Sequence, residues 1–301
     1  MGSQLQFSTW RKEPKPEMKR QLDQFYTKHS VAKKCYAFLR ITLPKLGLKT
    51  RQVFFIEPSA GTGSFFNLVK NKRKIGLDID PRGSGIIKQD FFTWRGPNRP
   101  RGSVVTFGNP PFGRRSRLAV NFFNRASEFS DTIAFIVPVQ FRKFSVHSKL
   151  AKDYKLVAEK LLGPDAFYST DGKDFHANCV FQVWTKRPTH LSNLRLLSAP
   201  PIEHPEFKIY QYNNTKQADK VFRYPFDFGV PRQGYENYRR RERDARKMER
   251  HKQWALFKAV NRKILIRLMS LDFERLAKTR NTTIPGFGKA DVVDEYVRRY
   301  A

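Results

Sequence analysis

The sequence predicts an α/β protein with a mostly parallel sheet, a late antiparallel hairpin and a smaller basic extension at the C-terminus. Two observations lead to this prediction. Over the first two thirds of the chain, short apolar runs typical of buried parallel strands alternate with helical patterns. The last third has a different composition and pattern of apolar residues, and it carries a large excess of Lys and Arg.

The chain is expected to begin with a flexible lead-in followed by a helix. Residues 1–20 are polar and contain prolines, which favours a loose segment. Between residues 23 and 39 the apolar side chains recur at helical spacing, and Thr27 or Ser30 is available as the N-cap. This pattern predicts a helix.

Strands are predicted next, as short apolar runs that end in turn-forming residues. They are residues 53–56, 74–80, 85–89, 103–107 and 132–137. Helical patterns at residues 64–69 and 118–129 lie between them. Residues 177–185 alternate in part, which predicts one arm of an antiparallel hairpin with a partner in 155–168. Strands that alternate with short helices indicate a Rossmann-like sheet.

The texture changes after about residue 187, where we expect a domain boundary. Residues 188–205 are rich in Pro and Ser and are predicted to form a linker or an edge loop. Residues 206–232 are predicted to form short strands and turns. Residues 239–250 mix Arg with Glu, which favours a solvent-exposed helix. A long helix is predicted from apolar side chains at i, i+3/i+4 spacing, which are Trp254, Phe257, Val260, Ile264, Leu268 and Leu271.

The charge of the chain indicates a polyanionic partner. Lys and Arg number 58 against 27 Asp and Glu, so the formal net charge is +31. Nucleic acid is favoured, because Lys and Arg contacts to phosphates release condensed counterions. An anionic membrane surface is the alternative, but no lipidation signal accompanies the charge. The absence of a long apolar run and of an apolar leader favours a soluble cytoplasmic protein, or a nuclear one in a eukaryote.

The chain has two cysteines, Cys35 and Cys179. Two are too few for a disulfide framework or for a structural zinc site without many His partners. We therefore expect two reduced thiols in the core and no metal.

A glycine-rich motif follows the strand at residues 53–56. It reads Glu57-x-Ser59-x-Gly61-x-Gly63 and precedes a short helical pattern. Glycines at such a turn let the backbone approach a ligand closely, and ligands of open α/β sheets bind at this edge. Taken alone, the pattern also fits an ordinary tight turn.

Acidic residues end the next two strands. Asp78 or Asp80 can accept hydrogen bonds from both hydroxyls of a ribose, and Asp78 is favoured. Asp90 can accept a hydrogen bond from an adenine amino group, with Phe91 beside the ring. Acids at strand ends also serve as helix caps, so neither motif is specific by itself.

The motif Asn109-Pro110-Pro111-Phe112 is more specific. The amino group on a base is a poor nucleophile because its lone pair is delocalised into the ring. The Asn109 side-chain oxygen and the Pro110 carbonyl can accept its two N–H bonds and turn the nitrogen toward tetrahedral geometry. Pro111 stiffens the turn, and Phe112 offers a face on which a base can stack.

In this order the motifs resemble those of the class I S-adenosylmethionine-dependent methyltransferases of the N6-adenine type. The family has a glycine loop for the methionine part, an acid for the ribose, a DF or DL pair at the cofactor adenine and a catalytic (D/N)PP(Y/F/W) loop. Phe25-Tyr26-Thr27 is similar to the family's F-x-T motif, which implies contact with the cofactor carboxylate. That motif precedes the glycine loop, as in the gamma order, in which target recognition follows the catalytic domain.

The resemblance covers residues 21–187 and implies the class I methyltransferase sheet there, with residues 188–301 as a basic target-recognition region. One departure is that the stretches 63–76 and 81–90 are short, so helices around the cofactor are expected to be trimmed or absent. The implied catalytic residues are Asn109, Pro110, Pro111 and Phe112. The implied cofactor-binding residues are Phe25, Tyr26, Thr27, Glu57, Ser59, Gly61, Gly63, Asp78, Asp90 and Phe91. The expected substrate-binding residues are Arg114, Arg115, Arg142 and Lys143.

The expected activity is methyl transfer from S-adenosylmethionine to adenine N6. DNA is favoured as the substrate because the gamma-like order with a C-terminal extension resembles DNA enzymes of restriction and phage systems. RNA is the alternative. A protein glutamine methyltransferase uses a very similar NPP loop, but the large positive charge argues against it. A non-catalytic nucleic-acid binder with a relic of the fold is a further alternative, and the intact motifs argue against it.

Overall fold

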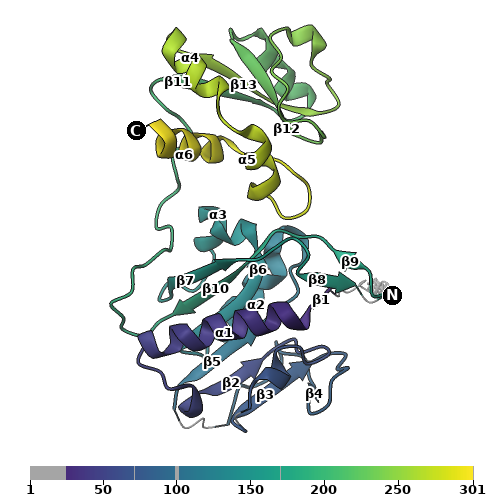
Figure 1. Cartoon of the computed structure of the whole chain (residues 1–301), viewed down its shortest axis with the longest axis vertical. Helices are drawn as coiled ribbons and strands as arrows, with labels where there is room; N and C mark the ends of the chain where they lie inside the picture. Colours follow the sequence, from purple (N-terminus) through teal and green to yellow (C-terminus); the bar gives the residue numbers. More distant parts are fainter. Residues whose placement is uncertain (1–24, 71, 99–101, 170, 301) are drawn as a thin grey trace, which may run out of the picture.

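The computed structural model describes residues 25–70, 72–98, 102–169 and 171–300. The lead-in expected at residues 1–20 lies outside these residues. The remaining chain forms a large sheet with helices on both faces, a small sheet beside it, and a separate C-terminal sheet with its own helices (Figure 1).

The large sheet has seven strands in the order β4-β3-β2-β5-β6-β10-β7. The parallel strands pair side by side, and β10 pairs antiparallel with both β6 and β7, which confirms the mostly parallel sheet with a late antiparallel hairpin. The chain moves from β2 outward to β4 and then returns to β5 on the other side of β2, so the order reverses between β2 and β5. At such a switch point the carboxyl ends of the strands frame a crevice. The strands are β2 (Phe54–Glu57), β3 (Lys74–Asp78), β4 (Ile87–Lys88), β5 (Val104–Gly108), β6 (Thr132–Pro138), β7 (Lys155–Leu161) and β10 (Cys179–Thr185).

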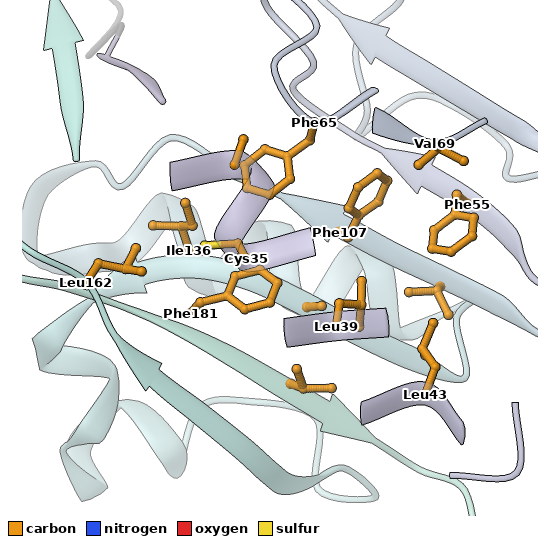
Figure 2. Close-up of a cluster of buried hydrophobic side chains, with 14 of the residues drawn as sticks. Cys35, Leu39, Leu43, Phe55, Phe65, Val69, Phe107, Ile136, Leu162 and Phe181 are labelled. Atoms are coloured by element: carbon orange, nitrogen blue, oxygen red, sulfur yellow. The ribbon is translucent and has the colours of Figure 1, made fainter. Parts of the chain in front are cut away.

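Helix α1 (His29–Lys45) covers one face of this sheet, and α2 (Arg117–Ser127) covers the other. Successive strand residues point to opposite faces, so Phe55 packs under α1 whereas Ile56 packs on the side of α2. Figure 2 shows the first core, in which Leu39 of α1 meets Phe107 and Phe181 of the sheet. Burial on both faces explains why these strands read as continuous apolar runs.

The helices near the glycine motif are short or absent, as expected. Between β2 and β3, where a helix over residues 64–69 was predicted, the described residues form only a 3₁₀ turn, Phe66–Leu68. No helix lies between β3 and β4 among the described residues. The carboxyl edge of β2 and β3 is therefore covered by loops.

The prediction for the start of the N-terminal helix was wrong. Residues Phe25–Thr27 form strand β1, which pairs antiparallel with β8 (Phe167–Ser169), and β9 (Asp174–Phe175) completes a small sheet. Helix α1 begins at His29 after Lys28, and neither Thr27 nor Ser30 caps it. Pairing with β8, more than a hundred residues away, overrides the local helical spacing.

Residues 188–203 contain no helix or strand, and part of this segment runs along the edge of the large sheet, where the Leu194 N–H donates to the carbonyl of Leu156 in β7 at 2.8 Å. Beyond it, a three-stranded antiparallel sheet has the order β11-β13-β12. A separate hydrophobic core packs this sheet against three helices. These elements are β11 (Phe207–Tyr212), β12 (Phe228–Gln233), β13 (Gln253–Ala259), α4 (Arg262–Met269), α5 (Phe273–Arg280) and α6 (Lys289–Tyr300).

The long helix predicted around Trp254 is also wrong, because residues Gln253–Ala259 form the central strand β13. Trp254 and Leu256 pack into one core cluster, whereas Ala255 and Phe257 pack into another, which is the alternation of a strand buried on both faces. The helix begins only after Asn261, whose side chain accepts a hydrogen bond from the Ile264 backbone at 3.0 Å.

The Arg-rich segment 239–250 is not the exposed helix that the sequence favoured, since it contains only the 3₁₀ turn Ala245–Lys247. Arg240 pairs with Glu242 and Glu249 and lies 5.1 Å from the centre of the Trp254 ring. Arg241 donates hydrogen bonds to backbone carbonyls at the end of α4. Several of these arginines therefore hold the loop in place.

The C-terminal elements contact the large sheet at its carboxyl edge. The Asn178 side chain, just before β10, donates hydrogen bonds to the backbone carbonyls of Lys278 and Asn281 at 2.6 and 2.8 Å. Its backbone N–H donates to the carbonyl of Thr282, and the Thr282 hydroxyl donates to Gln140, which follows β6. The basic C-terminal part is thus attached at the same edge of the sheet as the glycine, acid and NPPF motifs.

Candidate active site at the carboxyl edge of the sheet

The glycine motif forms a turn after β2 that is fixed to the end of β3. The Gly61 N–H donates to Oδ2 of Asp78 at 2.7 Å. Gly61 has a φ of +50°, and a Cβ built on it would lie 3.1 Å from the ring of Tyr26. Gly63 has a φ of +84°, and its Cβ would approach Asn67 to 2.7 Å. Both positions therefore require glycine, and the turn brings the backbone close to Tyr26 and Asp78.

The two acids after β3 lie in different surroundings. Asp78 is half-buried, and its second oxygen accepts a hydrogen bond from the Asp80 backbone N–H at 2.8 Å. Asp80 is exposed and lies 3.4 Å from Arg82. Of the two, Asp78 is the acid that faces the glycine turn.

Glu57 is a buried carboxyl at the end of β2, and its Oε2 has no hydrogen-bond partner among the described residues. Burial raises the pKa of Glu57 well above its ordinary value. A hydrogen bond from the Phe66 backbone opposes this rise, the charge of Asp78 adds to it, and Lys74 opposes it least. A Cβ added at Gly108 would lie 3.0 Å from Cγ of Glu57. The absence of a side chain at Gly108 thus makes room for this carboxyl.

Asn109 lies directly after β5, with its side-chain amide held in one orientation. The amide nitrogen Nδ2 donates to the backbone carbonyl of Phe25 at 3.4 Å, and Oδ1 is a buried acceptor with no partner in the described chain. The Ser59 hydroxyl donates to the backbone carbonyl of Asn109 at 3.2 Å. The F-x-T strand, the glycine turn and the NPPF loop therefore meet at one point.

Aromatic rings flank this point. Phe112 is half-buried, and its ring centre lies 6.1 Å from that of Phe167 in an edge-on arrangement. Tyr26 and Tyr168 have ring centres 5.6 Å apart, and Arg82 lies 5.6 Å from the centre of the Tyr26 ring. Burial raises the pKa of Tyr26.

Phe167 and Tyr168 were not predicted from the sequence to belong to the site. They pair with Thr27 and Tyr26 across β1 and β8 and so belong to the same site. The available signal was the aromatic pair at the end of the segment expected to form the hairpin partner.

The structure does not bring the Phe91 ring to this edge, which corrects the expectation that it lies beside the cofactor adenine. Phe91 is 1% exposed and stacks on Phe122 of α2, with ring centres 5.4 Å apart. The Asp90 carboxylate accepts a hydrogen bond from the Phe92 backbone N–H at 2.8 Å, and the ring of Phe92 is exposed. The turn after Asp90 directs the first of the two rings into the core because the α2 face offers several aromatic partners there.

The expected substrate-binding cations fall into two groups. Arg114 and Arg115 are exposed directly after the NPPF loop, where Arg115 and Ser116 both have positive φ, at 54° and 61°. Arg142 and Lys143, in contrast, have partners within the chain. Arg142 pairs with Glu159, and Lys143 lies 3.5 Å from Oδ1 of Asn281 in the C-terminal part. Arg114 and Arg115 are exposed next to the loop, whereas Arg142, although also exposed, is paired with a carboxylate.

No group of three or more His, Cys, Asp or Glu side chains in the described part of the chain is arranged to hold a metal ion. Cys35 and Cys179 are free and buried, as expected, and burial raises the pKa of the Cys35 thiol to about 12. No described helix is long and apolar enough to cross a membrane.

No protein-family model matches the sequence, and no curated protein matches it either. Solved structures of similar shape include a Pyrococcus horikoshii protein described as an RNA methyltransferase, at 18% identity and a TM-score of 0.43, over 59% of this chain and 92% of that one. The 23S rRNA methyltransferase ErmE matches at 12% identity and a TM-score of 0.37, over 55% of this chain and 70% of its own. The restriction-modification enzyme MmeI, solved in complex with DNA, matches at 10% identity and a TM-score of 0.42, over 86% of this chain and 64% of its own.

Proposed function

We propose that this protein transfers a methyl group from S-adenosylmethionine to the N6 amino group of adenine in DNA. The observation that carries the proposal is the orientation of the Asn109 amide. Because Nδ2 is engaged by the Phe25 carbonyl, the unpartnered atom is the acceptor Oδ1, as a substrate amino group requires. The Rossmann-like strand order supports it, since Asn109 lies beside the switch point of the sheet.

The residues at the carboxyl edge fit the methyl donor. Gly61 and Gly63 give the backbone room at the turn, and Asp78 presents a carboxylate there for ribose hydroxyls. Tyr26 and Glu57 complete the surroundings, and Oε2 of Glu57 remains available for a hydrogen bond. Ser59, Asp90 and the flanking residues Phe25 and Thr27 are proposed to contact the donor as well. When bound, S-adenosylmethionine supplies a methyl group on a positively charged sulfur, with a neutral thioether as the leaving group.

The chain's own contribution to the reaction is alignment and polarisation. Oδ1 of Asn109 and the carbonyl of Pro110 accept the two N–H bonds of the adenine amino group, which directs the nitrogen lone pair away from the ring. Pro111 restricts the backbone of the loop, and Phe112 provides a stacking face for the base. With the donor bound, the lone pair directed by Asn109 and Pro110 would take the methyl group as its bond to sulfur breaks, and the methylated nitrogen would lose one proton to solvent.

DNA is proposed as the substrate from the charge and from the C-terminal part. The net charge of +31 favours a polyphosphate, and Arg114 and Arg115 are exposed where the phosphates flanking a captured adenine would lie. In a duplex the adenine has to leave the stack, at a cost of a few kcal/mol. Residues 188–301, attached to the same sheet edge through Asn178, are proposed to hold the flanking DNA.

The test is transfer of a tritiated methyl group to DNA and, separately, to RNA, followed by identification of the methylated base. We expect N6-methyladenine in DNA from the wild-type protein and at least about a hundredfold less from Asn109→Ala, with cofactor binding retained, because positioned hydrogen bonds of this kind contribute on the order of 10²–10³ in rate. Asn121→Ala, on the exposed face of α2, is the matched control and is expected to be fully active.

Undiminished product from Asn109→Ala would overturn the proposed role of the loop. Product on RNA alone, or on a glutamine side chain of a protein, would replace the proposed substrate. Absence of heat on titration with S-adenosylmethionine would indicate a nucleic-acid binder without transferase activity.

A further inference from the structure

An open cavity of about 350 Å³ lies at one end of the C-terminal sheet, and none of its lining residues belongs to the proposed catalytic loop. The end of β12 and the start of β13 form its floor, and loops on either side form its walls. The lining residues are Asn214, Gln233, Gly234, His251, Lys252, Gln253 and Ile284.

The lining has the chemistry of a surface that contacts bases. It contains three carboxamides, one imidazole, one ammonium group and one exposed apolar side chain, and no carboxylate. Carboxamides pair with the edges of bases through a donor and an acceptor on one planar group, and an apolar side chain contacts a thymine methyl. A basic lining without acids suits a polyanion better than a peptide of mixed charge.

Two of the carboxamides are held in opposite orientations. Oε1 of Gln253 accepts a hydrogen bond from Arg232, which leaves its NH₂ group as a donor. Nδ2 of Asn214 donates to the carbonyl of His251 at 3.3 Å, which leaves its oxygen as an acceptor. The amide of the half-buried Gln233 makes no hydrogen bond within the described chain and offers both groups.

The cavity is joined to the large sheet by a short piece of chain. Thr282 donates to Gln140 at the carboxyl edge, and Ile284, two residues later, lines the cavity. Two residues span at most about 7 Å between Cα atoms. Gly286 then pairs with Gln233 on the cavity floor. Figure 1 shows this segment, after α5, on the side of the C-terminal sheet that faces the large sheet.

We propose that this cavity reads a base edge of the DNA target next to the adenine that is methylated. Asn214, Gln233 and Gln253 supply the hydrogen bonds that select the base, Ile284 supplies an apolar contact, and Lys252 a phosphate contact. The inference rests on the proposed function for its partner, DNA, but it concerns binding and not methyl transfer.

The test is a binding selection that does not depend on methylation. The full chain is incubated with a pool of duplex DNA of random sequence without S-adenosylmethionine, and the bound sequences are read. We expect the wild-type protein to enrich a sequence motif, and Gln233→Ala to lose the preference for one base in it by at least about fivefold. Gln217→Ala, an exposed carboxamide on the same part of the chain, is the matched control and should retain the whole motif.

A second variant, Asn214→Ala, guards against an effect of Gln233→Ala on folding, and the melting temperatures of all variants are compared with that of the wild type. An unchanged motif in both cavity variants would overturn the proposal, as would enrichment from an RNA pool or peptide library in place of DNA. A motif that changes as expected, with no methyl transfer by the wild type, would leave the cavity assignment standing and refute the proposed function alone.

Discussion

Gly61 packs against the ring of Tyr26 in a left-handed conformation, and we expect Gly61→Ala to disturb the turn in two ways. At a φ of +50°, a residue with a Cβ loses about 1–2 kcal/mol relative to glycine. The new Cβ would also lie 3.1 Å from one carbon of the Tyr26 ring and 3.3 Å from the next, so the ring has to shift. Since Tyr26 belongs to the proposed cofactor site, the shift should weaken cofactor binding.

Gly47→Ala separates the two effects. Gly47 has a φ of +70°, but a Cβ built on it meets no heavy atom within 4 Å beyond its chain neighbours. In both variants an alanine has to adopt a positive φ, which lowers the unfolding free energy. Alanine also reduces the conformational entropy of the unfolded chain, and this offsets about 0.4–1 kcal/mol of that loss. The remainder of about 1 kcal/mol corresponds to a fall of about 2–4 °C in melting temperature. Only Gly61→Ala is expected to lose a further tenfold, about 1.4 kcal/mol, in cofactor affinity.

Calorimetric titration with S-adenosylmethionine and thermal unfolding measure these quantities on the same samples. In the double variant Tyr26→Ala, Gly61→Ala, the contact between the new Cβ and the Tyr26 ring is gone. Its fall in melting temperature should therefore be smaller than the sum of the falls in the two single variants. If Gly61→Ala binds the cofactor as tightly as Gly47→Ala does, the glycine turn is not part of the cofactor site and the reasoning fails.

Two further predictions concern buried polar groups. Burial raises the pKa of Glu57 in the folded state, so above pH 4.5 the folded protein holds a proton on Glu57 that the unfolded chain has lost. The contribution of Glu57 to the unfolding free energy is therefore most favourable below the unfolded pKa near 4.5. It is lost as the pH rises toward the folded pKa. Glu57→Gln should therefore flatten the dependence of the unfolding free energy on pH above 4.5, and an unchanged slope in urea titrations would contradict this. Arg241→Ala should lower the unfolding free energy by about 1.5–3 kcal/mol, because it removes charged hydrogen bonds to the carbonyls of Met269 and Leu271. Arg246→Ala, at a side chain that is 90% exposed, should change it by less than about 0.5 kcal/mol, and equal effects of the two variants would refute the distinction.

The large sheet could be predicted from the sequence because its strands are buried on both faces. Such strands appear as short continuous apolar runs, and the glycine, acid and NPPF motifs mark where three of them end. The contact between Asn109 and the Phe25 carbonyl joins segments 84 residues apart, so spacing along the chain carried no information about it. The order of the motifs implied only that Phe25 and Asn109 belong to one site, and the hydrogen bond between them was not predicted.

The errors share one physical cause, which is pairing or packing between distant segments. Trp254 and Phe257 are spaced as on a helix, but Ala255 and Leu256 between them are equally buried, because β11 and β12 flank this segment. Phe91 is next to a proposed cofactor residue in sequence, yet it packs on α2. The sequence signal that would have favoured a strand is the unbroken apolar run at residues 254–257, in which the residues between the helically spaced ones are apolar too.

The attachment of the C-terminal part through Asn178 has a mechanical consequence. Its side chain and backbone, together with the hydroxyl of Thr282, form a small set of hydrogen bonds at the carboxyl edge of the sheet. Each contributes about 0.5–1.5 kcal/mol, so separating the two parts costs only a few kcal/mol at this point. Because the bonds share a few adjacent residues, they break together. At this edge the C-terminal part is therefore expected to separate from the large sheet in one step and not bond by bond.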